Sequence, residues 1–180
     1  LVKLPENGPE IRDIRGGRIA LIPQEPMAAF SPVHTIGDQI TEAIRLHRPV
    51  SKREAYKICI DTLHAVGMSM PEKRFNSYSW QLSGGLRQRA IIAMAIVSNP
   101  SILIADEPTT AIDVTTQAQI LKLLKKLQQE RDMTILFITH DLGVIAQMTQ
   151  YVVVMYLGRV MEKGPVDDIF HNPKHPYTRA

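Results

Sequence analysis

The stretch ILIADEP, residues 102–108, joins four apolar residues to two adjacent carboxylates, Asp106 and Glu107. The apolar run predicts a buried strand, and open α/β sheets bind ligands at the carboxyl ends of such strands. Because side chains alternate along a strand, one carboxylate can hold a metal-bound water while the other faces a substrate. An acidic turn without any ligand is the alternative for these two residues taken alone.

The chain around this stretch alternates between strand and helix. We expect helices over 115–130 and 142–148 and strands over 18–22, 102–105, 134–139, 152–156 and 160–164. The first of these helices carries one apolar stripe with spacings of three and four, formed by Ile120, Leu123, Leu124 and Leu127. This alternation predicts an α/β fold with a mostly parallel sheet.

Residues 36–98 interrupt the alternation with helices. We expect one helix over 36–46, a second over 51–66 that begins with a capping box of Ser51 and Glu54, and a third over 83–98. Pro71 and the stretch FNSYSW break the pattern between the last two. A helical subdomain inserted between two strands is therefore expected, whereas residues 1–16, rich in proline, glycine and charge, predict a loop.

The composition is that of one globular domain with a core, since 44% of the 180 residues are apolar and 22% are charged. The 21 basic and 18 acidic residues are interleaved, so the net charge of +3 does not call for a nucleic-acid partner. Cys59, the single cysteine, has no partner for an internal disulfide, which favours a reduced, cytoplasmic setting. We expect no leader, since no charged stretch followed by an apolar run opens the sequence, and the apolar runs are shorter than a membrane span.

The stretch LSGGLRQR, residues 82–89, places a serine and two glycines at the start of a predicted helix. The unpaired N–H groups and the dipole of a helix start attract anions, and a phosphate is the expected ligand. A tight turn with Ser83 as N-cap and no ligand explains the same residues. The usual phosphate cradle, G-x-x-x-x-G-K-[ST], is absent, and the dipeptide Gly-Lys does not occur in the sequence.

Two further polar side chains follow predicted strands. Gln24 comes after the strand over 18–22, behind Pro23, and His140 comes after the strand over 134–139. Taken alone, Gln24 is an ordinary loop residue, and His140 is a helix-start or packing residue rather than a phosphate donor. The other histidines do not lie at a metal-ligand spacing from His140, which argues against a metal site there.

In this order, Gln24, LSGGLRQR, ILIADEP, TTAID and ITHD resemble motifs of the ATPase subunits of ATP-binding cassette (ABC) transporters. The resemblance covers nearly the whole chain. It implies a partial P-loop NTPase (ABC ATPase) fold, with an inserted α-helical subdomain and without the Walker A (P-loop) segment. It also divides residues 1–180 into a Q-loop region (1–35), a helical signature subdomain (36–99), a core with Walker B, D-loop and switch (100–164), and a C-terminal tail (165–180).

The resemblance implies a role for each motif residue. Glu107 would orient or deprotonate the attacking water, His140 would contact the γ-phosphate, and Gln24 would join the metal to the membrane-facing loop. Asp106 would hold Mg²⁺ through water, with Gln24 beside it. The residues expected to contact ATP are Leu82, Ser83, Gly84, Gly85, Gln88 and Asp113.

The resemblance also implies partners. In this family two domains sandwich ATP head to tail, so the signature residues 82–88 would serve a nucleotide held by a second ABC ATPase subunit. Transmembrane permease subunits and, indirectly, an extracytoplasmic solute-binding protein are expected as well, at the cytoplasmic face of the cell membrane. No nucleic acid is expected.

Longer stretches, such as QEPMAAFSPVHTIGDQI and the closing NPKHPYTRA, look like those of the oligopeptide, dipeptide and nickel importers. The expected function of the complete subunit is therefore ATP hydrolysis that powers peptide import. The alternatives are nickel import and a non-transport ABC ATPase of nucleic-acid repair or the ribosome, although the insertion has no heptads or cysteine pairs. Without a Walker A segment, residues 1–180 alone are expected to be inactive.

Overall fold

The computed structural model describes residues 4–25, 29–110 and 112–179. They form two compact units, Leu1–Ile138 and Thr139–Ala180, which we describe separately. The boundary falls inside the expected core over 100–164, and the division of the chain made from the resemblance stays a prediction.

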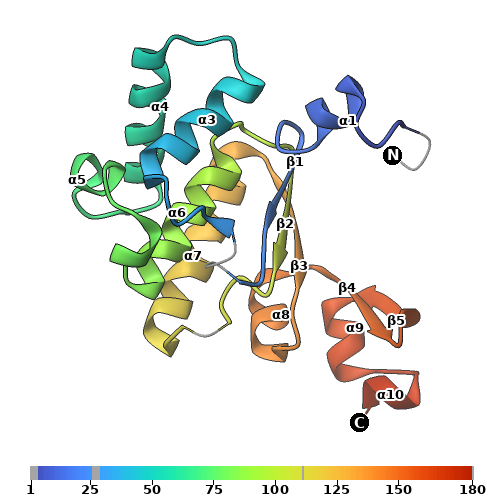
Figure 1. Cartoon of the computed structure of the whole chain (residues 1–180). Coiled ribbons are helices and arrows are strands. Elements are labelled where there is room, and N and C mark those ends of the chain that lie inside the picture. Colours follow the sequence, from blue (N-terminus) through green and yellow to red (C-terminus); the bar gives the residue numbers. More distant parts are fainter. Residues whose placement is uncertain (1–3, 26–28, 111, 180) are drawn as a thin grey trace. The chain divides into compact units, whose positions relative to one another are not determined.

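The first unit is built on a parallel sheet in the order β1-β2-β3 (Figure 1). Its strands are β1 (Ile19–Ile22), β2 (Ile102–Asp106) and β3 (Thr134–Ile138). In the sheet register, Leu21 pairs with Ile104, and Ile104 pairs with Leu136. All three strands lie within one residue of the ranges predicted from the sequence.

The predicted helical subdomain is inserted between β1 and β2, two neighbouring strands of the sheet. Its elements are α3 (Ile36–His47), α4 (Lys52–Ala65), α5 (Pro71–Phe75), the 3-10 helix η1 (Ser79–Gln81) and α6 (Gly84–Ile96). The predicted capping box is present, because Ser51 and Glu54 each accept a backbone N–H from the other. Pro71 does more than break the pattern: it starts a short helix, since proline suits a first position that needs no N–H.

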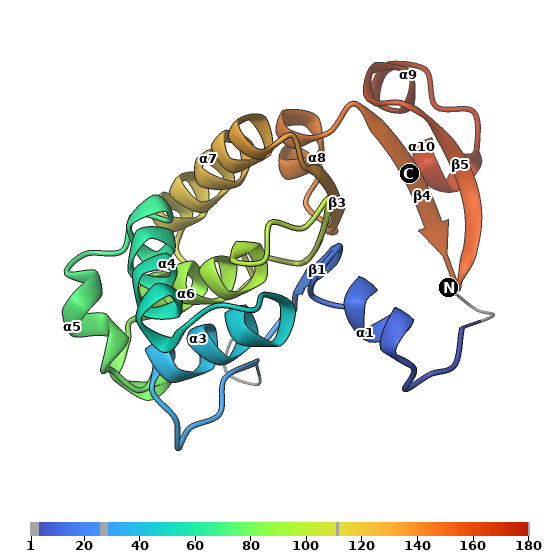
Figure 2. The same cartoon turned by 90° about the horizontal axis from the view of Figure 1, so that it is seen from above.

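The first unit also has helices outside this subdomain. In α7 (Val114–Arg131) the predicted apolar stripe is buried, with Ile120, Leu124 and Leu127 each no more than 1% exposed. The predicted loop over 1–16 was wrong for α1 (Pro9–Ile14), a short helix that starts with proline and buries Ile11. Figure 2 shows α6 and α7 on the same side of the strands.

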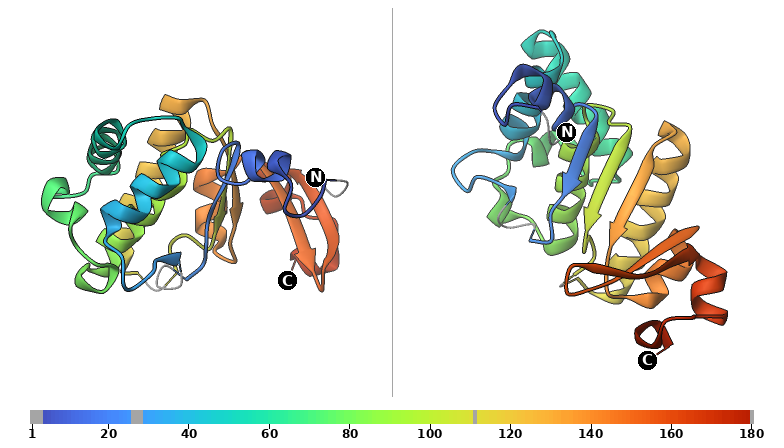
Figure 3. Two further views of the ribbon diagram at one scale, coloured as in Figure 1. Left: turned by 45° about the horizontal axis from the view of Figure 1, so that its top comes forward. Right: turned by 90° about the vertical axis from the view of Figure 1, so that its right-hand side faces the viewer.

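The two faces of the parallel sheet differ sharply in exposure. On one face, Ala20, Ile22, Leu103 and Ala105 are each no more than 5% exposed. On the other face, Leu21, Leu136 and Ile138 are 55%, 53% and 48% exposed. The right-hand view of Figure 3 looks onto the strands with α6 and α7 behind them. Because parallel sheets are normally covered on both faces, the second face is unusually open.

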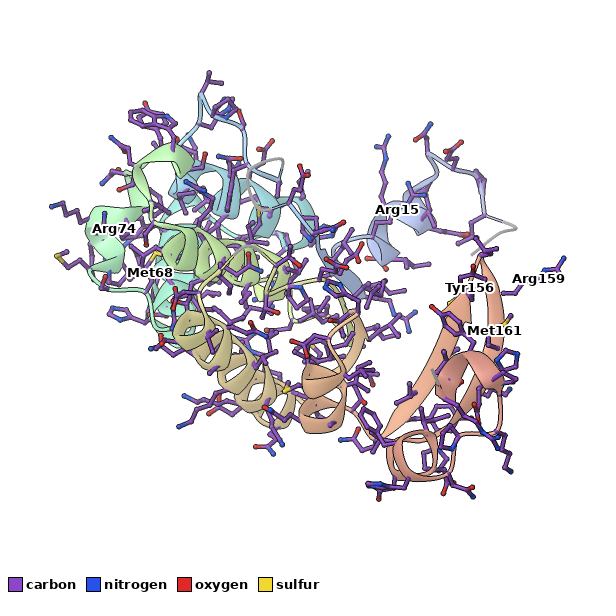
Figure 4. The ribbon with its side chains drawn as sticks, turned by 90° about the horizontal axis from the view of Figure 1, so that it is seen from below. Arg15, Met68, Arg74, Tyr156, Arg159 and Met161 are labelled. Atoms are coloured by element: carbon purple, nitrogen blue, oxygen red, sulfur yellow. The ribbon has the colours of Figure 1, made fainter. Side chains whose placement is uncertain are left out.

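The second unit contains an antiparallel hairpin. Its elements are α8 (Leu142–Met148), β4 (Tyr151–Tyr156), β5 (Arg159–Pro165), α9 (Val166–His171) and α10 (Pro176–Arg179). Tyr156 and Arg159 flank the hairpin turn, and Met161 lies further along β5 (Figure 4). The carboxylate of Glu162 accepts the N–H groups of Lys174 and His175 at 2.8 and 3.0 Å, which holds the C-terminal tail to β5.

Within the described ranges, each helix is too short or too polar to cross a membrane.

Candidate functional site

Glu107 stands directly after β2 in a strained backbone conformation. Its φ of 44° lies in the left-handed region, although a residue that precedes a proline normally stays extended. Its N–H donates to the carbonyl of Ile138 at 2.8 Å, and its carbonyl accepts the N–H of Thr110 at 3.1 Å. The neighbouring strand and the loop itself thus hold Glu107 in place, and strain of this kind is frequent at functional sites.

The side chain of Glu107 is held as firmly as its backbone. One carboxylate oxygen, Oε2, accepts the Gln24 Nε2 at 3.0 Å and the Thr110 Oγ1 at 2.8 Å. Gln24 follows β1 and Glu107 follows β2, so two adjacent parallel strands bring these predicted site residues together at the carboxyl edge. Thr110 was missed from the sequence as a site residue, although it lies in the quoted stretch TTAID, three residues after Glu107.

Asp106 is the last residue of β2 and is half-buried. Its carboxylate and the amide oxygen of Gln24 are the oxygen ligands that Mg²⁺ prefers. Among the residues that the structure describes, no three His, Cys, Asp or Glu side chains gather closely enough to cage a metal ion. Mg²⁺ keeps several waters and binds through one or two carboxylates and substrate phosphates, so this sparse donor set fits it.

The two glycines at the start of α6 have different surroundings. Ser83 is the N-cap, and its Oγ accepts the N–H of Leu86 at a long 3.4 Å. Among the described residues, a Cβ added at Gly84 would meet only Ile112, at 3.9 Å, whereas a Cβ at Gly85 would come within 2.8 Å of Thr116. Packing against the start of α7 therefore requires glycine at position 85 but leaves room at position 84.

Two of the residues expected to contact ATP are buried inside the first unit. Leu82 is 4% exposed and Gln88 is 2% exposed. The Gln88 Nε2 donates to the carbonyl oxygen of Pro108 at 2.6 Å, which links α6 to the loop after Glu107. Nothing in the sequence pointed to this contact, because the two residues lie in different motifs. The contact of both residues with a nucleotide stays a prediction.

Asp113, the predicted D-loop aspartate, is the N-cap of α7. Its carboxylate accepts the Thr116 hydroxyl at 2.6 Å and the Thr116 N–H at 3.0 Å. These hydrogen bonds, the one from the hydroxyl above all, lower the pKa of Asp113. Ala111 in the same loop lies outside the described residues, as do residues 26–28 of the stretch QEPMAAF.

His140 belongs to the second unit and lies two residues before α8. The N-cap of that helix is Asp141, whose Oδ1 accepts the N–H groups of Gly143 and Val144 at 2.8 and 3.2 Å. The helix-start role considered for His140 therefore falls to its neighbour. Its contact with a γ-phosphate stays a prediction.

Comparison with known proteins places these features in a family. Residues 4–110 match the family model described as ABC transporter. A putative peptide import ATP-binding protein of Brucella melitensis is 56% identical over 93% of this chain and 50% of its own length. An oligopeptide transport ATP-binding protein of Bacillus subtilis is 52% identical over 99% of this chain and 49% of its own length.

A solved structure has the same fold. It is a dimeric, post-hydrolysis ATP-binding cassette bound to ADP and phosphate, with a TM-score of 0.79 and 30% identity, covering 91% of this chain and 68% of its own. The predicted fold class, a partial α/β P-loop NTPase fold of the ABC ATPase type with an inserted helical subdomain, is therefore confirmed. The chain spans about half the length of the curated peptide-import relatives described above.

Proposed function

This chain belongs to the ABC transporter family, and on that premise we propose that it is part of a subunit that hydrolyses ATP to power peptide import. The names of relatives at 51–56% identity support peptides as the transported class. The observation that carries the catalytic part is the placement of Glu107 at the carboxyl edge of the sheet, where Gln24 and Thr110 donate to its carboxylate.

ATP hydrolysis transfers the γ-phosphoryl group to water, and proteins assist mainly by positioning reactants and stabilising charge. In our proposal the Glu107 carboxylate orients the attacking water or accepts its proton. The N–H of Gln24 and the O–H of Thr110 fix the direction of that carboxylate. Mg²⁺, held through water by Asp106 and the Gln24 oxygen, would neutralise phosphate charge.

The exposed start of α6 supports a second element of the proposal. Ser83 and Gly84 are exposed, and the first turn of α6 presents N–H groups that have no carbonyl partner within the helix, together with the positive end of the helix dipole. We propose that they hold the γ-phosphate of an ATP bound by a second, homologous subunit, and that Asp113 and His140 each contact a nucleotide as well. Permease subunits in the membrane would then anchor the pair at its cytoplasmic face.

Glu107→Gln in the full-length protein tests the catalytic role. Glutamine has nearly the same shape but does not accept the proton, so ATP binding should persist while hydrolysis falls by about 10²- to 10⁴-fold. Steady-state phosphate release and ATP titration measure the two effects. Turnover near that of the parent protein would remove Glu107 from the mechanism.

A mixed dimer tests the site shared between subunits. One subunit carries a disrupted phosphate-binding loop and the other carries Gly84→Asp, which places a carboxylate against the expected phosphate. Position 84 has room for a side chain, and an acidic residue suits the first turn of a helix, so folding should be unaffected. Gly85→Asp is unsuitable, because its Cβ would clash with Thr116.

In a head-to-tail pair, both lesions fall on the same composite site and leave the other site intact. About half of the activity should then survive if the two sites work independently. If the start of α6 instead serves the nucleotide of its own subunit, both sites are damaged and activity is lost. The same pair of lesions placed together in one subunit, with an unaltered partner, is the matched control.

A further inference from the structure

Gln88 is buried, although it belongs to the stretch LSGGLRQR that is expected to contact ATP. Its side chain is 2% exposed, and its Nε2 donates to the Pro108 carbonyl oxygen at 2.6 Å. A buried amide without a hydrogen-bond partner costs free energy, so breaking this hydrogen bond would destabilise the fold. The Pro108 carbonyl belongs to the peptide unit that follows the one joining Glu107 to Pro108.

The loop over 107–110 is fixed from several directions. β3 accepts the N–H of Glu107, and Thr110 donates to both the carbonyl and the carboxylate of Glu107. Gln24 donates to the same carboxylate from the loop after β1. Gln88 adds a hydrogen bond from α6, the helix that begins at the candidate phosphate site. Because the φ of Glu107 is strained, the direction of its side chain depends on these surrounding contacts.

We propose that Gln88 is a positioning residue for Glu107, so that its hydrogen bond to Pro108 makes the direction of the carboxylate depend on the position of α6. This inference rests on the proposed function. It assigns Gln88 to the interior of its own subunit rather than to nucleotide contact.

The hydrogen bond from Gln88 links the start of α6, where we propose that a phosphate binds, to the loop that carries Glu107. Ser83 caps α6, and Gln88 lies five positions further along this continuous helix, which ends at Ile96. A phosphate held at the helix start shifts or fixes the helix as a body, and the buried hydrogen bond carries that displacement to the Pro108 carbonyl. The nucleotide held by one subunit thereby adjusts the base that acts on the nucleotide of the other.

Gln88→Met in the full-length protein tests the proposal. Methionine keeps the length of the side chain but has no N–H donor, so the Pro108 carbonyl loses its partner. A misplacement of about 1 Å at a reacting group costs up to about 10²-fold, so we expect kcat to fall about 10- to 10²-fold while KM for ATP stays within about twofold. Ile91→Val is the matched control, because Ile91 is 1% exposed on the same helix and its side chain makes no hydrogen bond.

A merely structural role is distinguished by combining variants. If Gln88 acts through Glu107, then Gln88→Met lowers the residual rate no further when Glu107 is already glutamine. An equal loss of rate in both backgrounds, or a lower melting temperature with unchanged kcat, overturns the proposal. Should the methionine variant not fold, Gln88→Asn keeps the amide at a shorter reach and carries the same expectation. High activity of Glu107→Gln alone would instead overturn the proposed function.

Discussion

The covered and open faces of the β1-β2-β3 sheet carry the same kind of residue in very different surroundings. Leu103 on the covered face is fully buried, whereas Leu136 on the open face is 53% exposed. On the covered side lie α6 and α7, helices that this chain itself supplies (Figure 2). The open face holds apolar residues from all three strands, and parallel sheets in α/β proteins have helices on both faces. The open face therefore calls for a covering layer that the described residues of this unit do not provide.

The largest expected effect is the difference in activity and stability between residues 1–180 alone and the full-length protein. The open face, together with the lack of a G-x-x-x-x-G-K-[ST] sequence, leads us to expect no ATPase activity and a poorly cooperative melt from the short chain. An exposed strand edge such as that of β3 also favours aggregation. Phosphate release, calorimetric ATP titration and a thermal scan measure the difference, and micromolar ATP affinity in the short chain would contradict it.

On the covered face, Leu103→Ala should have the largest effect of the substitutions considered below. Leu103 is 0% exposed, so the change removes a buried side chain and leaves a cavity, at a cost of about 2–5 kcal/mol. Urea unfolding of the full-length protein measures the loss. A cost under about 1 kcal/mol would mean that the covered face is not part of the core.

Leu136→Ala then asks whether the open face is covered in the full-length protein. A residue that stays on the surface changes stability by only about 0.5 kcal/mol or less. We expect a larger cost, about 1–3 kcal/mol, because a cover over β3 would bury this leucine. Val114→Ala is the exposed control, since Val114 is 82% exposed on α7, where no sheet face is involved. Equal effects of the two substitutions would show that the face stays open.

The features that could be predicted from the sequence are local or periodic. The capping box of Ser51 and Glu54 and the buried stripe of α7 depend on spacings within one helix, and both are present. The strands followed from short apolar runs bounded by turn residues. In contrast, α1 was missed. Proline, glycine and charge predict a loop, and the burial of Ile11 that accompanies the helix is a tertiary feature that the sequence does not show.

The geometry of the candidate site was only partly accessible from the sequence. The carboxyl-edge rule for parallel strands indicated that Gln24 and Glu107 belong to one site, and the structure joins them by a hydrogen bond. The left-handed backbone of Glu107 contradicts the local preference before a proline and is held by contacts from other elements. The bond from Gln88 to Pro108 is likewise a tertiary contact, which neither motif contains on its own.

The smallest expected effect concerns the capping box of α4, which involves neither face of the sheet. The pKa of Glu54 is lowered, mainly by the hydrogen bond from the Ser51 hydroxyl and then by that from the Ser51 N–H. A carboxylate whose folded pKa is depressed stabilises the fold above its unfolded pKa, about 4.3, and loses that contribution as the pH falls through the folded value. Glu54→Gln should therefore be slightly less stable than the parent protein at pH 7 and should approach it at acid pH.

Urea unfolding of the full-length Glu54→Gln variant and its parent, at pH 7 and near pH 3, measures this convergence. Because the capping box lies within a single helix end, the effect should not depend on what covers the sheet. Ser51→Ala is the matched comparison. It removes the hydroxyl that caps the N–H of Glu54 and should cost about 0.5–2 kcal/mol at pH 7. If Glu54→Gln were as stable as the parent at pH 7 and less stable in acid, the sign of the argument would be reversed, and the ionised carboxylate would not contribute to the cap.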